Sequence, residues 1–403
     1  MQSGFRWSRI GLLVLVIGAC YVAWQWPLLV RLYKVVTLYD EDKIVNNFLH
    51  MEDAFPTKVL QPSSNPQLLT PALAELPAQF EFDGHMLDTQ AFLADSRTTG
   101  LIVLKDAQIL YEHYWQGMSD DSTHMSFSLA KSFLSALIGI AVEEGAIGSI
   151  EEPVTRYAPE LKGSGYDGVR IKDVLQMSSG VGFNEDYGDF FSDINRFSRT
   201  VALGQPFNEF ATTLQREFEP GTYNQYVSID TQVLGMVLVN ATGKPLTEYL
   251  QEKIWQPAGM ASQAYYLTDF TGMELALGGL NVTLRDYARF GLLYLHNGQR
   301  DGLQIVPSHW IHDSVTADAP HLQPGDNPAS KHKYGYGYQW WLPDGRDDEY
   351  QGQGIYGQYI VIDPDKHIVI VKTSANHRYN DQSLRWQDKH QALFRAISQY
   401  YSE

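Results

Sequence analysis

The sequence predicts an α+β fold: one antiparallel sheet built from N- and C-terminal strands, flanked by helices, with a helical subdomain inserted between the strands. Two pairs of strand-like stretches support the sheet, 100–104 with 109–115 and 358–362 with 368–371. Each pair is rich in β-branched and aromatic residues and is joined by a short polar turn, which is typical of a β-hairpin. Residues from about 150 to 276 instead have a mostly helical pattern with long loops. Because the strands enclose this helical region, we expect the two hairpins to join in a single sheet.

The composition is that of a large folded domain. Hydrophobic residues make up 44% of the 403 residues and aromatic residues 13%, which is enough for an extensive core. The net charge of −17 argues against nucleic acid as a partner and against attraction to anionic lipid. Cys20 is the single cysteine of the sequence, which excludes an intrachain disulfide and a cysteine-based metal cluster. We predict no metal and no cofactor, and the sequence gives no indication of an oligomeric state.

An apolar run near the N-terminus predicts a membrane anchor. Arg6 and Arg9 precede the run from Ile10 to Val30, which as a helix would span about 31 Å, roughly one hydrocarbon core. Two alternatives remain open: a cleaved signal peptide, and lipoprotein processing at Cys20. With the arginines inside, we expect a single-pass anchor in the inner membrane and a body that faces the periplasm.

Three regions follow from this pattern. Residues 1–40 form the anchor and the juxtamembrane segment, residues 41–79 form a proline-rich connector, and residues 80–403 form the main domain. A final helix near 382–401 is expected to cover the sheet.

The motif with the most chemical information is Ser128-Leu129-Ala130-Lys131. A serine three residues before a lysine places a hydroxyl and an amine on one helix face, so that a partly neutral lysine can activate the serine. The apolar run from Phe133 to Val142 predicts a buried helix behind it, whose N-terminus favours a developing oxyanion. A second match, Ser330 to Lys333, lies in a polar stretch and is interpreted as a solvated loop.

Two further segments could complete the site around Ser128. Tyr226 precedes a helical run and could share a proton with Lys131, or it could pack at a seam between subdomains. The segment Gly352-Gln353-Gly354 leads to Ile355, whose N–H could pair with that of Ser128 as an oxyanion hole. An ordinary glycine-rich turn is the alternative.

Together these segments resemble the serine β-lactamase and penicillin-recognising family, and within it the class C-like branch of carboxylesterases and 6-aminohexanoate-dimer hydrolases. The resemblance extends from about residue 80 to the end of the chain. It implies a β-lactamase/transpeptidase-like fold with Ser128 as nucleophile, Lys131 as its activator, Tyr226 as acid/base and the Ile355 N–H in the oxyanion hole. The matching stretches are 128–133, 163–166, 175–180, 220–222, 278–291 and 354–358.

The chain also departs from the family pattern. The second motif, usually Tyr-x-Asn, is Tyr226-Val227-Ser228, and the Lys-Thr-Gly of true β-lactamases is Gly352-Gln353-Gly354. The segment Lys372-Thr373-Ser374 comes one strand too late to replace it. A lysine in the third motif would bind a substrate carboxylate, so its absence favours esters and amides with uncharged ends.

Four residues are predicted to bind substrate: Tyr187, Ser228, Gln353 and Gly354. Tyr187 resembles a tyrosine that contacts substrate in the 6-aminohexanoate-dimer (nylon oligomer) hydrolases. The acidic residues around it, Glu185, Asp186 and Asp189, could meet an amine-bearing substrate or belong to a solvated loop.

These observations predict a membrane-anchored, exported serine hydrolase that cleaves ester or amide bonds in small molecules or short peptides through an acyl-serine intermediate. One alternative is a β-lactamase or D-alanyl-D-alanine peptidase that acts on cell-wall peptides, and another is a catalytically inactive envelope binding protein. A serine–histidine–acid triad lacks the Gly-x-Ser-x-Gly elbow, and a metal hydrolase lacks a His-Glu-x-x-His motif.

Overall fold

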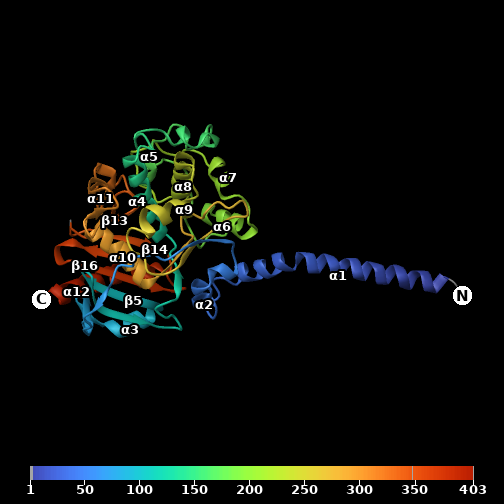
Figure 1. Cartoon of the computed structure of the whole chain (residues 1–403), viewed down its shortest axis with the longest axis horizontal. Coiled ribbons are helices and arrows are strands. Elements are labelled where there is room, and N and C mark those ends of the chain that lie inside the picture. Colours follow the sequence, from blue (N-terminus) through green and yellow to red (C-terminus); the bar gives the residue numbers. More distant parts are fainter. Residues whose placement is uncertain (1–2, 347, 403) are drawn as a thin grey trace.

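Strands from both ends of the chain join in one sheet, as predicted (Figure 1). In the computed structural model, which describes residues 3–346 and 348–402, the sheet has eight strands in the order β12-β13-β14-β15-β16-β5-β6-β2. Strand β5 (Thr98–Lys105) pairs antiparallel with β6 (Gln108–Tyr114) on one side and with β16 (Ile368–Ser374) on the other. The two predicted hairpins therefore meet in the interior of the sheet.

The edges of this sheet add short strands. β15 (Gln358–Asp363) pairs with β14 (Tyr350–Gly354), and β13 (Trp341–Leu342) and β12 (Gly335–Tyr336) follow, all antiparallel. At the other edge β2 (Thr70–Pro71) runs parallel to β6, so the prediction of a wholly antiparallel sheet is wrong at this strand. The reason is that β2 reaches the edge from the N-terminal segment, without the hairpin that would reverse its direction.

A second sheet binds the N-terminal segment to the domain. Its order is β1-β8-β9-β7, with all pairs antiparallel. The strands are β1 (Thr57–Leu60), β8 (Ala264–Leu267), β9 (Leu280–Thr283) and β7 (Thr123–Met125). Helix α2 (Ile44–Leu49) lies just before β1, and its Phe48 is fully buried. Residues predicted to form a connector thus pack against the main domain. Two small hairpins complete the strands, β3 (Gln79–Phe82) with β4 (His85–Asp88) and β10 (Gln299–Arg300) with β11 (Leu303–Gln304).

Helices cover both faces of the large sheet. α12 (Trp386–Ser402) and α3 (Thr89–Asp95) bury one face, and α10 (Leu284–Leu295) packs on β15 and β16 from the opposite face. α4 (Leu129–Glu143) lies beside β14 and carries the predicted serine motif at its N-terminus. The helical subdomain of Figure 1 lies beyond α4, and its α8 packs against α4. Its helices are α5 (Ile171–Leu175), α6 (Asp193–Leu203), α7 (Phe207–Thr212), α8 (Ser228–Thr242) and α9 (Leu246–Leu250), and α11 (Ser308–Ser314) packs on α4 from the C-terminal half.

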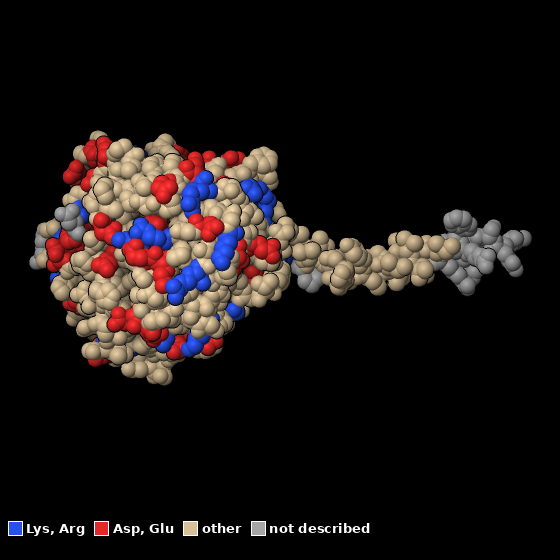
Figure 2. Space-filling model, turned by 90° about the horizontal axis from the view of Figure 1, so that it is seen from above, with Lys and Arg blue, Asp and Glu red and all other residues tan. Residues whose placement is uncertain are grey.

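Helix α1 (Ser3–Val36) projects from the domain (Figure 1). Beyond its grey end it carries no charged side chain until it nears the domain (Figure 2). Among the described residues no single helix is long and apolar enough to span a membrane, but Ile10–Trp26 and Leu28–Val36, bent by 53°, together have a suitable length and composition. The side chains of Arg6 and Arg9, assigned above to the inner side, lie outside the described residues. Near the domain, buried Arg31 donates to the Val201 carbonyl at 2.9 Å and lies over the Phe270 ring at 4.4 Å.

Close packing of α4 gives a first testable prediction. A Cβ at Gly139 would lie 2.3 Å from a ring carbon of Trp310. We therefore expect Gly139→Ala to destabilise the fold by about 1–3 kcal/mol, because the ring must move in a densely packed core. Thermal unfolding followed by circular dichroism measures the effect. Gly18→Ala is the control, because nothing lies within 4 Å of its Cβ position. An unchanged Tm in Gly139→Ala would show that the ring adjusts freely.

Candidate active site

Ser128 and Lys131 lie together at the start of α4. Ser128 is the N-cap residue, and Lys131 follows one turn later with 1% of its surface exposed. The Lys131 Nζ donates to the Leu277 carbonyl at 2.6 Å. Burial lowers the pKa of Lys131 to about 7, although the nearby carboxyls of Glu185 and Asp230 act in the opposite direction. A large fraction of Lys131 is therefore a neutral amine, a proton acceptor, near neutral pH.

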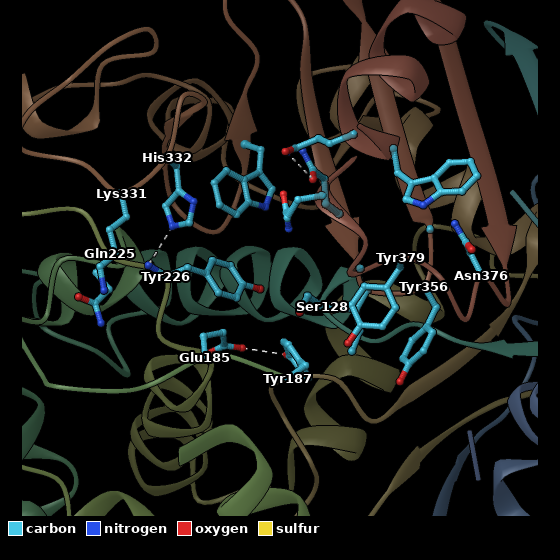
Figure 3. A pocket seen from close by; sticks show the side chains of 18 of the residues that line it. Ser128, Glu185, Tyr187, Gln225, Tyr226, Lys331, His332, Tyr356, Asn376 and Tyr379 are labelled. Carbon is cyan, nitrogen blue, oxygen red and sulfur yellow. Dashed lines mark hydrogen bonds between the residues drawn. The ribbon is translucent and has the colours of Figure 1, made fainter. Parts of the chain in front are cut away.

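Tyr226 lies next to this pair, directly before α8. Its hydroxyl faces the side chains of Ser128 and Ser228, and its ring lies 5.5 Å from the Lys131 Nζ. Figure 3 shows the hydroxyl directed toward Ser128. The ring stacks on Trp341 with 5.4 Å between centroids, which fixes its orientation. Burial raises the pKa of Tyr226 far above its usual value, so the residue is a phenol and not a phenolate in the resting protein.

His332 is part of the site, although sequence analysis placed it in a solvated loop. Lys331 and Lys333 of that loop are exposed, as predicted, but His332 turns inward. Its Nε2 accepts a hydrogen bond from the Tyr226 N–H at 3.3 Å, and its ring packs edge-on against Trp341. Burial lowers the pKa of His332 to about 4, so the imidazole is neutral and able to accept this bond. A polar stretch gives no signal of such a contact, which forms only between distant segments.

The third predicted segment forms the hairpin between β14 and β15. Gly352, Gln353 and Gly354 belong to strand β14, and Ile355 begins the turn. A Cβ at Gly354 would lie 2.7 Å from the Ser126 carbonyl, so glycine allows the turn to approach the residues just before Ser128. The close approach is thus to the protein backbone, where sequence analysis expected the substrate. Ile355 and Ser128 line the same cavity.

Glu185 connects two of the predicted substrate-binding residues, Tyr187 and Ser228. Its carboxylate accepts from the Ser228 hydroxyl at 2.6 Å, from the Ser228 N–H at 3.0 Å and from the Tyr187 hydroxyl at 2.8 Å (Figure 3). Burial raises the pKa of Glu185, while the hydrogen bonds of Ser228 and the charge of Lys131 act against the increase. The interpretation as a solvated loop is therefore wrong for Glu185, which caps α8, and is confirmed for exposed Asp186 and Asp189.

These residues surround a cavity of about 740 Å³ (Figure 3), within the range of small-molecule sites. Ser128, Tyr187 and Tyr226 line it from the helical side, and Gln353, Gly354 and Ile355 line it from the sheet. The Gln353 Oε1 accepts from the Gln387 Nε2 at 3.0 Å. The structure thus brings all eight predicted site residues to one place, counting Lys131 and Ser228 behind the cavity wall, and leaves a neutral amide at position 353.

A second prediction concerns the pH dependence of this site. Because the charge of Glu185 raises the pKa of Lys131, Glu185→Gln is expected to lower it, and the acid limb of kcat/KM should move to lower pH. A pH–rate profile of the hydrolysis measures the shift. Asp186→Asn removes the same charge from the exposed neighbouring position and should leave the limb unchanged. An identical shift in both variants would show that only net charge matters.

A serine at a helix N-terminus, a buried lysine of lowered pKa and a tyrosine whose hydroxyl faces that serine define a serine hydrolase that uses no histidine base. The comparisons with known proteins agree. The Beta-lactamase family model matches residues 89–393. The 6-aminohexanoate-dimer hydrolase of Paenarthrobacter ureafaciens is 32% identical over 296 residues, which cover 72% of this chain and 75% of that protein. The chain therefore belongs to the β-lactamase family.

Solved structures show the same fold. A Bacillus anthracis structure that carries the provisional name 6-aminohexanoate-dimer hydrolase superposes with a TM-score of 0.80 at 26% identity, and the match covers 90% of this chain and 95% of that one. A family VIII carboxylesterase superposes with a TM-score of 0.56 at 16% identity, over 76% of this chain and 95% of that one. The predicted β-lactamase/transpeptidase-like α+β fold is confirmed.

Proposed function

We propose that this protein is a membrane-anchored, exported hydrolase that cleaves esters and amides of small molecules through an acyl-Ser128 intermediate. The observation that carries the proposal is the position of Tyr226, whose hydroxyl faces Ser128 beside a buried Lys131 of lowered pKa, at a cavity large enough for a small substrate.

Acylation begins with attack of the Ser128 Oγ on the substrate carbonyl carbon. The Ser128 proton passes to Tyr226 as the phenol proton of Tyr226 passes to the neutral amine of Lys131. The carbonyl oxygen becomes an oxyanion, which the N–H groups of Ser128 and Ile355 stabilise. When the bond to the leaving group breaks, the proton on Lys131 returns by the same route to the departing oxygen or nitrogen.

Deacylation repeats these steps with water as the nucleophile. The proton of the attacking water passes to Lys131, the ester bond to Ser128 breaks, and the Ser128 oxygen regains a proton. The products are a carboxylic acid and the free enzyme. Tyr226 suits the relay because its phenol is uncharged at rest and its hydroxyl faces Ser128.

The proposed substrate class rests on the sheet side of the cavity. At the position of the family's third-motif lysine the chain has Gly352, and the next residue, Gln353, is bonded to Gln387 and carries no charge. A substrate carboxylate would therefore meet no lysine there, which favours esters and amides without a required anionic end. The similarity to a 6-aminohexanoate-dimer hydrolase supports the inclusion of amides.

Anchoring and export are proposed from α1. The apolar segments Ile10–Trp26 and Leu28–Val36 support insertion into a bilayer, and Arg6 and Arg9 support an inner-membrane anchor with the domain in the periplasm. Membrane fractionation with and without alkaline carbonate, together with protease protection in spheroplasts, tests this part separately from the chemistry.

The test of the reaction uses the full chain in detergent micelles. The panel is p-nitrophenyl acetate, the matching p-nitroanilide, a D-alanyl-D-alanine peptide and a penicillin, with intact mass recorded during turnover. Ester or anilide hydrolysis with an acyl adduct that Ser128→Ala lacks would support the proposal. Turnover confined to the peptide or the penicillin would favour the cell-wall alternative, and neither turnover nor adduct would favour a binding protein.

A further inference from the structure

A second, smaller pocket adjoins the candidate nucleophile. It has a volume of about 120 Å³ and shares Ser128, Tyr187 and Ile355 with the large cavity. Its walls come from segments far apart in the sequence: the end of α1 and the residues after it, α6, and the loop before β9. Its apolar lining includes Val35, Leu38, Phe55, Phe197, Val201 and Leu275. Ser128 therefore lies between an open polar cavity and an apolar pocket.

The segment after α1 also supports both sides of the proposed oxyanion hole. The Tyr39 ring stacks on Tyr356 with 5.3 Å between centroids and 9° between planes. Phe48 of α2 packs edge-on against Phe127 at 4.9 Å and against Tyr356 at 5.1 Å. Phe127 precedes Ser128, Tyr356 follows Ile355, and both have positive φ angles, of 45° and 65°. Tyr39 and Phe48 thus contact the residues next to both predicted oxyanion donors.

The chemistry of the small pocket restricts what it can hold. Its described lining residues include no Asp, Glu, Lys or Arg. A hydrocarbon chain gains free energy by leaving water there, whereas an ammonium or carboxylate would lose hydration without a counter-ion. A group of the size of a water molecule occupies about 30 Å³. The pocket volume of about 120 Å³ therefore accommodates about four carbons.

We propose that the segment joining α1 to the domain is a wall of the active site, and that the pocket it closes binds a short, straight, uncharged acyl chain of about four carbons beyond the carbonyl. The leaving group then occupies the large polar cavity, and the scissile bond lies at Ser128 between the two. This inference rests on the proposed acyl-Ser128 chemistry. It assigns to the anchor segment a part in substrate selection in addition to attachment.

A chain-length series tests the pocket in the full-length protein. We expect kcat/KM for p-nitrophenyl pentanoate to exceed that for the acetate by about tenfold or more, and to fall by about tenfold at the decanoate. Val35→Phe fills the pocket and should lower the ratio of kcat/KM for the pentanoate to kcat/KM for the acetate by about tenfold. Val36→Phe is the matched control, because the Val36 side chain is 79% exposed and outside the pocket, and its profile should equal that of the wild type.

A pair of inhibitors gives a readout that needs no turnover of the test ligand. Butylboronic acid and 4-aminobutylboronic acid both form a reversible adduct with an active-site serine and differ only in a terminal ammonium. We expect the butyl compound to bind about a hundredfold more tightly, because the ammonium would lie in the apolar pocket. Leu38→Ala enlarges the pocket and provides a second variant, with an expected shift of the best ester to a longer chain.

The outcomes separate the two proposals. Ser128-dependent acetate hydrolysis with a flat chain-length profile, or equal binding of the two boronic acids, would overturn the pocket assignment and leave the proposed reaction intact. Equal profiles for Val35→Phe and Val36→Phe would overturn the part assigned to α1. Absence of any ester turnover and of any serine adduct would overturn both.

Discussion

Lys131→Met is expected to lower kcat/KM by about a thousandfold while the fold is retained. Methionine fills a similar volume in the fully buried position but cannot accept a proton from Tyr226 or Ser128. In the wild type, kcat/KM should rise with pH through the deprotonation of Lys131, near its pKa of about 7. The residual activity of the variant should lack this acid limb. A pH–rate profile of both proteins on one ester is the measurement.

Lys131→Met should also raise the free energy of unfolding. The sign of this change follows from the linkage between proton binding and unfolding. A lysine with a pKa of about 7 when folded and about 10.5 when unfolded binds more protons in the unfolded chain, so wild-type stability increases between pH 7 and 10.5 and is lowest below pH 7. At pH 7 the gain for Lys131→Met is roughly 3–5 kcal/mol before relaxation. Urea unfolding curves recorded at increasing pH should show this gain in stability falling to zero near pH 10.5.

Lys372 provides the control for this prediction. It is also fully buried, donates to the Ser374 hydroxyl, and has its pKa lowered to about 7 by burial. It lines neither pocket beside Ser128. Lys372→Met should therefore give a similar gain in stability and keep activity within about tenfold of the wild type. Equal losses of activity in the two variants would show that burial of a lysine, and not its position beside Tyr226, accounts for the effect.

The features that the sequence predicted correctly have local causes. The helix behind Ser128 follows from an unbroken apolar run, and the hairpin at 363–366 follows from a polar turn between two β-branched stretches. The pairing of β5 with β16 is not local, but it follows once strands at both ends must bury their apolar faces in one sheet. The serine and the lysine of the site were also identifiable from a local pattern, because one helix turn sets their spacing.

The features that sequence analysis missed depend on contacts between distant segments. His332 is inward-facing because of Tyr226, more than a hundred positions earlier, and Glu185 is half-buried because it caps the helix that begins at Ser228. The stretch around Phe48 is short and is followed by Pro56, and nothing in its own pattern indicates that it packs beside Phe127 and Tyr356. The apolar pocket has no sequence signature at all, because each of several segments contributes only a few side chains.

Tyr226→Phe isolates the hydroxyl that connects Ser128 to Lys131. Phenylalanine keeps the ring stacked on Trp341, so the fold and the shape of the cavity should remain. Without the phenol the proton relay is broken, and we expect kcat to fall by about a hundred- to ten-thousandfold with KM within about threefold of the wild type. Tyr336→Phe is the control. This buried tyrosine packs edge-on against the Tyr226 ring, with 6.3 Å between ring centroids, and its hydroxyl should be dispensable.

Comparison of single-turnover and steady-state rates then locates the affected step. If Tyr226 acts in both half-reactions, acyl transfer to Ser128 and release of the acid should slow together, and little adduct should accumulate in Tyr226→Phe. Accumulation of the adduct would instead restrict Tyr226 to deacylation. Turnover close to that of the wild type would assign the proton transfer to Lys131 alone, and the Tyr226 hydroxyl would then have no part in the reaction.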